Sequence, residues 1–209
     1  MIDFVAIDFE TADPNNPCSL GIAQVENSEV TLVKQWLIKP ACYPYFHFYS
    51  QKIHKITKED VQFQPEFDKL WVEIAPFISN RTLVAHNAAF DISVLKKTLQ
   101  YYKIPIPKFN YFCSYLTARL AWKDNQKYSL DFLCNQEKIN LTHHRADSDA
   151  YGCAQIFLRE LQILNISNLN ELKKISKKVE REENLAKKER QLIRELKKEE
   201  KKGKKLTIQ

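Results

Sequence analysis

Two acidic residues stand near the end of the first apolar run of the chain. Residues 2–9 (IDFVAIDF) are mostly apolar and β-branched, which is typical of a strand buried on both faces of a sheet. Side chains alternate along a strand, so Asp8 and Glu10 point to the same side. Burying two carboxylates is costly unless a cation neutralises them, and a hard divalent metal ion is the natural partner. Two solvated acids at a strand terminus have the same pattern, so this pair alone does not establish a metal site.

Two further segments combine a histidine with an acidic residue. Residues 83–91 (LVAHNAAFD) predict a strand, a turn and the first turn of a helix that carries Asp91, where an acid also complements the helix dipole. Residues 143–150 (HHRADSDA) predict a loop histidine and an aspartate at a helix start, and both can face one cleft. The residues themselves leave open whether His143 or His144, and whether Asp147 or Asp149, is the functional one.

Taken together, the three segments resemble the motifs of the DEDDh exonucleases of the RNase H-like superfamily. Residues 7–11 (IDFET) are similar to the first motif and residues 86–91 (HNAAFD) to the second, and the third corresponds to His144 with Asp149 five residues later. The likeness covers about residues 1–165 and includes residues 53–57 (IHKIT), in which Lys55 replaces the family's glycine. The family spacing selects His144 over His143 and Asp149 over Asp147.

The resemblance implies a 3′→5′ exonuclease that hydrolyses nucleic acid, with DNA as the expected substrate, and that uses two divalent ions, Mg²⁺ or Mn²⁺. Two ions about 3.5–4 Å apart can stabilise the charge on the attacking and leaving oxygens of a phosphodiester. In the family pattern, Asp8 bridges both ions, Glu10 and Asp149 complete the first, and Asp91 supports the second. His144 is the expected general base, because a neutral imidazole can accept the proton of water.

Substrate contacts and partners also follow from the resemblance. Thr11, His54 and Phe90 are expected to contact the terminal nucleotide. The implied partners are a nucleic acid with a free 3′ end and a replication or repair protein such as a polymerase. A ribonuclease or oligoribonuclease on the same scaffold is an alternative, since no residue can be assigned to reading the 2′-hydroxyl. A catalytically inactive adaptor that binds nucleic-acid ends is a second alternative, but the complete set of five site residues argues against it.

The elements that must position these residues begin as strands and continue as alternating helices and strands. Strands are expected at residues 2–9, 18–25, 30–38 and 82–86, with a hairpin turn at 26–29. Helices are expected from Thr57, over 67–78 and 90–101, from Ser129, and over 147–164. This order predicts an α/β domain at residues 1–165, with an RNase H-like mixed sheet that starts antiparallel, continues with parallel strands and is flanked by helices.

The positive charge of the chain lies in its C-terminal segment. The formal net charge is +6, and residues 166–209 contain fifteen Lys and Arg against eight Glu, so residues 1–165 are close to neutral. Bulk charge is therefore no argument for a nuclease. Residues 168–202 predict a long charged helix whose heptad pattern from Leu172 permits a coiled coil. A solvated helix or linker, a basic arm that contacts phosphate, and an oligomerisation seam are the three interpretations, so the oligomeric state stays open.

Composition excludes several other classes of protein. A chain of 209 residues with 44% hydrophobic residues can bury one sizeable core. The five scattered cysteines favour reduced thiols in a cytoplasmic protein over a disulfide framework or zinc site. No apolar run is long enough to span a membrane, and the acidic N-terminus is unlike a signal peptide, so no membrane partner is expected. Three glycines are too few for a glycine-rich phosphate loop.

Overall fold

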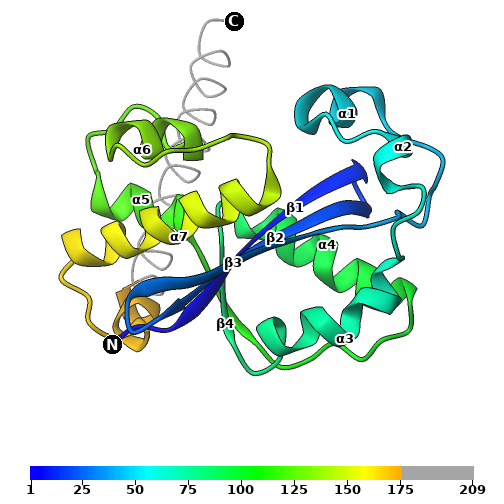
Figure 1. Cartoon of the computed structure of the whole chain (residues 1–209). Coiled ribbons are helices and arrows are strands. Elements are labelled where there is room, and N and C mark those ends of the chain that lie inside the picture. Colours follow the sequence, from blue (N-terminus) through cyan, green and yellow to red (C-terminus); the bar gives the residue numbers. More distant parts are fainter. Residues whose placement is uncertain (176–209) are drawn as a thin grey trace, which may run out of the picture. The chain divides into compact units, whose positions relative to one another are not determined.

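A computed structural model describes residues 1–175 of the chain (Figure 1). Met1–Ser167 form one compact unit, and a separate unit begins at Asn168. Residues 169–175 of this second unit are helical. The remainder of the charged helix and heptad pattern expected over residues 168–202 lies outside the described residues. The strands and helices that are named below all belong to the first unit.

Five strands form one mixed sheet in the order β3-β2-β1-β4-β5. The strands are β1 (Phe4–Asp13), β2 (Asn16–Glu26), β3 (Glu29–Leu37), β4 (Thr82–Ala85) and β5 (Asn110–Cys113). The pairs β1–β2 and β2–β3 are antiparallel, and the pairs β1–β4 and β4–β5 are parallel. The turn expected at residues 26–29 joins β2 to β3, and positive φ angles at Asn27 and Ser28 suit a tight hairpin turn. The predicted mixed sheet is therefore confirmed.

Strand β1 is longer than the sequence pattern predicts. The expected strand ended at Phe9, whereas β1 continues to Asp13 and pairs with β2 along its whole length. Asp8 and Glu10 consequently lie inside a strand, and not at its end. The apolar run stops at Asp8, but hydrogen bonds to β2 carry the strand further. The β1–β2 register is irregular directly after Glu10, as in β-bulges that lie next to active sites.

Seven helices belong to Met1–Ser167. In chain order they are α1 (Phe48–His54), α2 (Lys58–Val61), α3 (Phe67–Ile78), α4 (Ala88–Tyr101), α5 (Ser114–Ala121), α6 (Leu130–Gln136) and α7 (Ala146–Ile163). The expected helices correspond to α2, α3, α4, α6 and α7, with shifts of one or two residues. Thr57 caps α2 as expected, in a reciprocal capping box with Asp60. Elements α1, β5 and α5 were not predicted.

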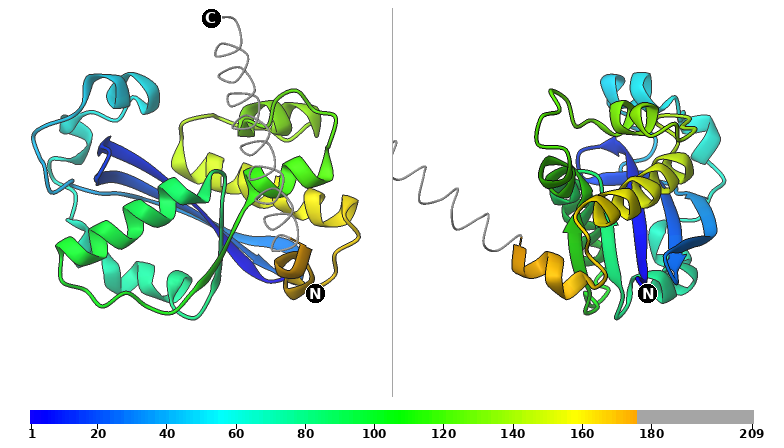
Figure 2. Two further views of the ribbon diagram at one scale, coloured as in Figure 1. Left: turned by 180° about the vertical axis from the view of Figure 1, so that it is seen from behind. Right: turned by 90° about the vertical axis from the view of Figure 1, so that its left-hand side faces the viewer.

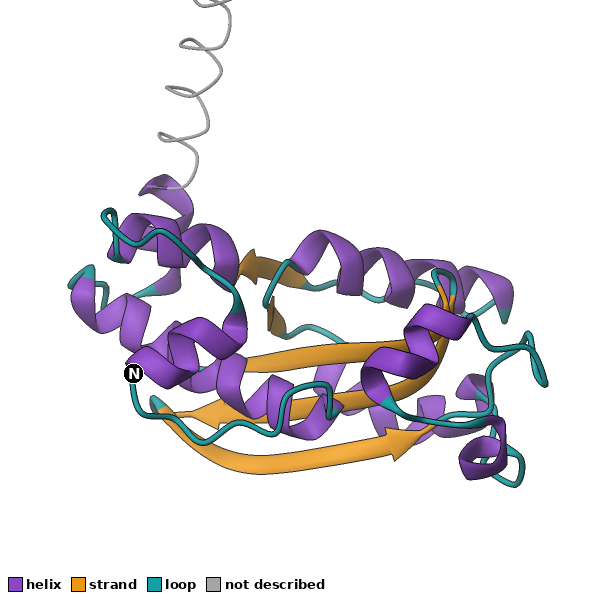
Figure 3. Ribbon diagram, turned by 90° about the horizontal axis from the view of Figure 1, so that it is seen from above, coloured by secondary structure: helices purple, strands orange, loops and turns teal. Residues whose placement is uncertain are grey.

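Alternate residues of β1 face different helices. Val5, Ile7 and Phe9 belong to a core cluster that includes the apolar faces of α3 and α4. On the other face of the sheet, Phe4 packs edge-on against Phe157 of α7, with ring centroids 5.1 Å apart. Asp8 and Glu10 are in phase with Phe4, so they lie on the α7 side. Figures 1 and 2 show α7 on one face of the sheet and α3 and α4 on the other, and Figure 3 shows the strands between helices.

Gly21 of β2 allows α7 to touch the sheet beside the acidic residues. It is the partner of Asp8 in the β1–β2 ladder. A Cβ atom at Gly21 would lie 1.9 Å from the carbonyl oxygen of Ala146 and 2.4 Å from the backbone nitrogen of Asp147. The start of α7 therefore rests directly on β2. This close approach brings Asp149, in the first turn of α7, to the side of Asp8.

None of the helices among residues 1–175 is long and apolar enough to cross a membrane. The five cysteines are all free thiols. Disulfide bonds therefore do not hold the fold, which depends on its packed core and hydrogen bonds.

We expect Gly21→Ala to lower the free energy of unfolding by about 2–3 kcal/mol, because backbone atoms at the start of α7 would have to move. Gly152→Ala is the matched control. Its added Cβ meets the flexible side chains of Leu141, at 2.7 Å, and Cys134, at 3.0 Å, and alanine gains about 1 kcal/mol of helix propensity. Urea unfolding of both variants measures the difference. Equal stabilities would contradict the role given to the close approach.

Candidate active site

Three carboxylates from two elements meet at one pocket. Asp8 and Glu10 extend from β1, and Asp149 from the first turn of α7. Each offers a ligand atom within 4.8 Å of the others. The three line a pocket of about 590 Å³ together with Phe9, His86, Asn87, Tyr115, Ser129, Leu130, His143 and His144. The alternation along β1 and the contact at Gly21 account for this meeting of residues far apart in the sequence.

Asp91 lies beside this cluster but is held differently. It is in the first turn of α4 and is almost completely buried. The backbone N–H of Phe9 donates a hydrogen bond of 3.0 Å to its Oδ1. Asp91 is not among the residues that line the pocket. Its charge nevertheless acts on Asp8, so the fourth expected carboxylate is part of the same electrostatic group.

Asp8, Glu10 and Asp91 resist ionisation. Burial, followed by the charges of Asp91, Asp149 and Glu10, raises the pKa of Asp8 well above its usual range. Burial and the charge of Asp149 raise the pKa of Glu10 to about 7. Burial likewise raises the pKa of Asp91 to about 7, although the hydrogen bond from Phe9 opposes the shift. Oxygen atoms that repel one another at this spacing fit a hard divalent cation such as Mg²⁺ or Mn²⁺.

The loop before α7 wraps around the carboxylate of Asp149. His143 Nδ1 lies 2.9 Å from Asp149 Oδ1, and the backbone N–H of His144 donates a 2.7 Å hydrogen bond to Oδ2. The two imidazole rings stack with centroids 3.9 Å apart. His143, His144 and Asp149 also form a second group whose ligand atoms lie within 4.8 Å of one another. Both histidines therefore reach the pocket, and His143 makes the direct side-chain contact with Asp149.

The two aspartates of this segment have different surroundings. The carboxylate of Asp147 accepts two hydrogen bonds from the guanidinium of Arg145, at 2.9 and 2.6 Å. This ion pair lowers the pKa of Asp147. Asp149, in contrast, is buried and faces the pocket. The structure thus brings Asp149, and not Asp147, into the carboxylate cluster.

The three residues expected to contact a terminal nucleotide line an adjoining pocket of about 270 Å³. Thr11, His54 and Phe90 are joined there by Ile53 and, among others, by Glu10, which lines both pockets. The ring nitrogens of His54 are already engaged within the protein. Its Nδ1 accepts a 3.0 Å hydrogen bond from the backbone N–H of Ile56, and its Nε2 lies 3.2 Å from the carbonyl oxygen of Thr11.

Other residues of the main pocket have no assigned role in the sequence pattern. His86 belongs to the second motif, but no role was given to it. It lies directly before Asn87 and the start of α4, and this position could have indicated that it lines the pocket. Tyr115 and Ser129 come from α5 and from the residue before α6. The sequence marked Ser129 only as the start of a helix, and no local pattern indicated that either residue lines the pocket. They reach the pocket only because of the packing of α5 and α6.

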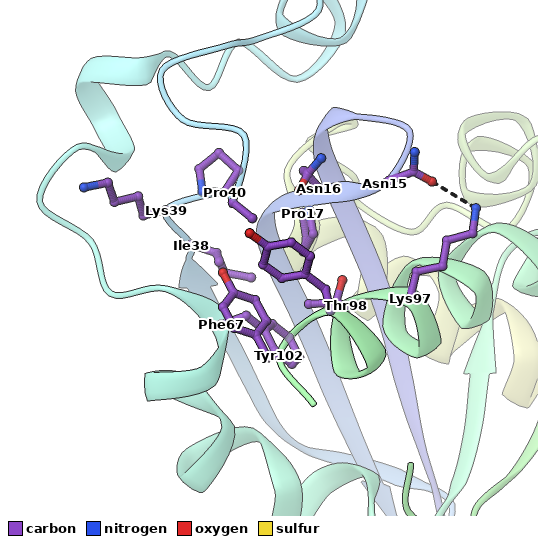
Figure 4. Close-up of a pocket in the computed structure, with 12 residues that line it drawn as sticks. Asn15, Asn16, Pro17, Ile38, Lys39, Pro40, Phe67, Lys97, Thr98 and Tyr102 are labelled. Atoms are coloured by element: carbon purple, nitrogen blue, oxygen red, sulfur yellow. Dashed lines mark hydrogen bonds between the residues drawn. The ribbon is translucent and has the colours of Figure 1, made fainter. Parts of the chain in front are cut away.

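A third pocket, also of about 270 Å³, lies away from this cluster (Figure 4). Its walls include Phe67, Thr98 and Tyr102, and at its rim Lys97 donates a 2.9 Å hydrogen bond to Asn15 Oδ1. It contains no carboxylate, imidazole or thiol among its lining residues. Chemistry that needs such groups is therefore not expected in this third pocket.

Comparison with known proteins identifies the family of the chain. A family model described as Exonuclease (RNase_T) matches residues 5–157. The DNA polymerase III subunit epsilon of Buchnera aphidicola subsp. Baizongia pistaciae (strain Bp) is 33% identical over 141 residues, which cover 61% of this chain and 58% of that protein. The chain thus spans less than two thirds of this relative.

Solved structures share the fold. Exonuclease X in complex with 5′ overhanging duplex DNA has a TM-score of 0.63 at 24% identity, over 76% of this chain and 91% of that one. The nuclease domain of 3′hExo, a DEDDh family member bound to rAMP, has a TM-score of 0.64 at 15% identity, over 77% and 92%. With a family model that matches most of its length and the fold of DEDDh exonucleases, this chain belongs to the exonuclease family.

Proposed function

We propose that this chain is a metal-dependent nuclease that hydrolyses phosphodiester bonds and so releases nucleotides from the 3′ end of DNA. The observation that carries the proposal is the meeting of Asp8, Glu10 and Asp149 at one pocket, with ligand atoms within 4.8 Å of one another. Membership of the exonuclease family supports the reaction class. The similarity to a DNA polymerase III subunit supports DNA as the substrate.

Asp8, Glu10 and Asp149 would hold divalent cations, Mg²⁺ or Mn²⁺. The family resemblance implies two of them, with Asp91 supporting the second. Bound cations would stabilise the charge that develops on the phosphate and would acidify the attacking water. The chain holds the oxygens in place before any cation arrives. His143 and the backbone of His144 fix both oxygens of Asp149, and the contact at Gly21 fixes the helix that carries it.

His144 is the proposed general base. Its side chain lines the carboxylate pocket. Burial, followed by the neighbouring His143, lowers the pKa of His144, so its ring is neutral near pH 7 and can accept a proton. His143 has a different role in this proposal: it orients Asp149 through the 2.9 Å contact between its Nδ1 and the carboxylate.

The terminal nucleoside is proposed to occupy the adjoining pocket. Ile53 and Phe90 are 50% and 40% exposed, so their apolar surfaces are available to a base, and Thr11 adds a polar group. Glu10 lines both pockets, which makes the path from nucleoside to scissile phosphate continuous.

Polymerase partnership and a catalytic domain at residues 1–165 are further parts of the proposal. The epsilon relative is by name a subunit of DNA polymerase III. A ribonuclease is the second candidate, favoured by the likeness in fold to a DEDDh nuclease bound to rAMP. An inactive adaptor would have no use for four mutually repelling carboxylates, whose clustering opposes folding unless a cation binds.

Replacing Asp8 tests the proposed site. We expect Asp8→Asn to lower the rate of nucleotide release in saturating Mg²⁺ by at least about a thousandfold, which corresponds to roughly 4 kcal/mol. The free energy of unfolding should stay equal or increase, because one repelling charge is removed. Asp147→Asn is the control: its carboxylate pairs with Arg145 outside the cluster, so its rate should be unchanged. A folded Asp8→Asn protein that retains more than about a tenth of the rate would refute the site.

The two histidines should have separable effects. We expect His144→Ala to lower kcat by about a hundredfold or more, the usual contribution of a general base, without raising the Mg²⁺ concentration for half-maximal activity. His143→Ala should instead raise that Mg²⁺ concentration and leave kcat nearly unchanged at saturating metal, since it loses only the contact that orients Asp149. Metal titrations of both variants measure these quantities. The roles are wrong if both substitutions change the same parameter equally.

A further inference from the structure

A further buried carboxylate lies in the last turn of α7, and the proposed reaction does not use it. Glu160 is completely buried. Its Oε1 lies 2.9 Å from the hydroxyl of Ser114, the first residue of α5. Its Oε2 has no hydrogen-bond partner among the described residues. A buried carboxylate with one unpaired oxygen is costly when ionised, so its presence here calls for a physical reason.

Glu160 begins a chain of hydrogen-bonding groups that ends at the wall of the carboxylate pocket. The hydroxyl of Ser114 also lies 3.2 Å from His86 Nδ1. The other ring nitrogen of His86, Nε2, lies 2.8 Å from the carbonyl oxygen of Tyr128. The chain therefore connects α7 and α5 with the residue after β4 and with the segment before α6.

The positions of the protons follow from the groups at the end of this chain. A carbonyl oxygen can only accept, so His86 Nε2 carries a proton and donates it to Tyr128. In a neutral ring, Nδ1 is then an acceptor for the single proton of Ser114. In that case the Ser114 oxygen has no proton left to donate to Glu160 and can only accept a hydrogen bond from it. Glu160 must then carry the proton that it donates. If Ser114 donated to Glu160 instead, its 3.2 Å contact with His86 Nδ1 would be a hydrogen bond only with a buried imidazolium opposite a buried carboxylate.

Burial favours the neutral arrangement over the ion pair. It raises the pKa of Glu160 well above its usual range and lowers the pKa of His86. Each shift favours the uncharged form of its group. The unpaired Oε2 of Glu160 is also better tolerated on a neutral carboxyl than on an ionised one.

We propose that protonated Glu160 is a positioning residue for the nuclease site and acts through Ser114 and His86 on the pocket wall near Tyr128. His86, Ser129 and Leu130 line the same pocket as the carboxylate cluster. Ser129 and Leu130 follow Tyr128 directly, and α6 begins there and leads on to the histidine loop. Fixing the carbonyl of Tyr128 therefore fixes the start of the segment that ends in His143 and His144.

The same helix thereby holds two sides of the pocket. Asp149 and Glu160 are eleven residues apart on α7, which is about 16 Å along a helix axis. Asp149 contributes a carboxylate to the cluster at one end, and Glu160 supports the wall through hydrogen bonds at the other. A displacement of α7 would consequently change both the carboxylate cluster and the pocket wall near Tyr128.

Three variants of the full chain distinguish the effect of the proton on Glu160 from the effect of the size of its side chain. Glu160→Gln stays neutral and can still donate to Ser114, Glu160→Leu removes the polar group, and Ser114→Ala removes one oxygen in the middle of the chain. Nitrogen-15 chemical shifts of the imidazole report which ring nitrogen of His86 carries the proton, and the His86 signals are identified by their loss in His86→Asn. Nucleotide release with Mg²⁺ gives kcat and the metal requirement.

The expected result is a neutral, Nε2-protonated His86 in the parent protein and in Glu160→Gln, with kcat of that variant within about twofold of the parent. Glu160→Leu and Ser114→Ala should alter the His86 signals and lower kcat on the order of ten- to a hundredfold, the usual effect of a misplaced group. Their Mg²⁺ requirement should not change, because the carboxylate cluster is intact. If Glu160→Leu does not fold, Ser114→Ala carries the test.

The inference is overturned if Glu160→Gln loses as much activity as Glu160→Leu, since an ionised carboxylate would then be required. It is also overturned if Ser114→Ala leaves the His86 signals and kcat unchanged. The kinetic part rests on the proposed nuclease function, whereas the His86 signals do not. A parent protein with no nuclease activity would therefore refute the proposed function and leave the hydrogen-bond chain to be judged from the spectra.

Discussion

Repulsion between like charges is the constraint around which the site of this protein is built. Carboxylates from β1, α4 and α7 are gathered where burial weakens their solvation, and burial and mutual repulsion together raise the pKa of the central residue, Asp8. The cluster lowers the stability of the folded protein, and a ligand of opposite charge that binds only the folded protein would restore that stability. A divalent cation is such a ligand for carboxylate oxygens.

The fold holds this cluster together with a small number of specific contacts. The missing side chain at Gly21 allows the start of α7 to rest on β2, next to the strand that carries Asp8. The oxygens of Asp149 are fixed by His143 and by the backbone of His144. Asp91 is tied to the backbone of β1 at Phe9. The contacts at Gly21 and Asp91 join elements distant in sequence, so the cluster forms only when sheet and helices have assembled.

Local patterns in the sequence predicted much of this fold, and the motif spacing selected the residues of the site. Alternation along β1 indicated that Asp8 and Glu10 share a face, and the period of residues 67–78 indicated α3. The short helices α1 and α5 were missed because His47 and Cys113, which precede them, are not typical capping residues, unlike those before α2 and α6. The short strand β5 was missed because it lacks the buried apolar run that marks β4. The full length of β1 and the chain from Glu160 to His86 depend on tertiary contacts. Ser114 and Glu160 are 46 residues apart, and no local signal relates them.

The central claim is that this pocket hydrolyses DNA from a 3′ end with the help of divalent cations. The most direct measurement follows single strands labelled at either end, with Mg²⁺ or with EDTA. The claim predicts immediate release of a labelled mononucleotide from 3′-labelled strands, a progressively shortening ladder from 5′-labelled strands, and no product with EDTA. Internal cleavage products, release of the 5′ label first, or hydrolysis that persists in EDTA would contradict it.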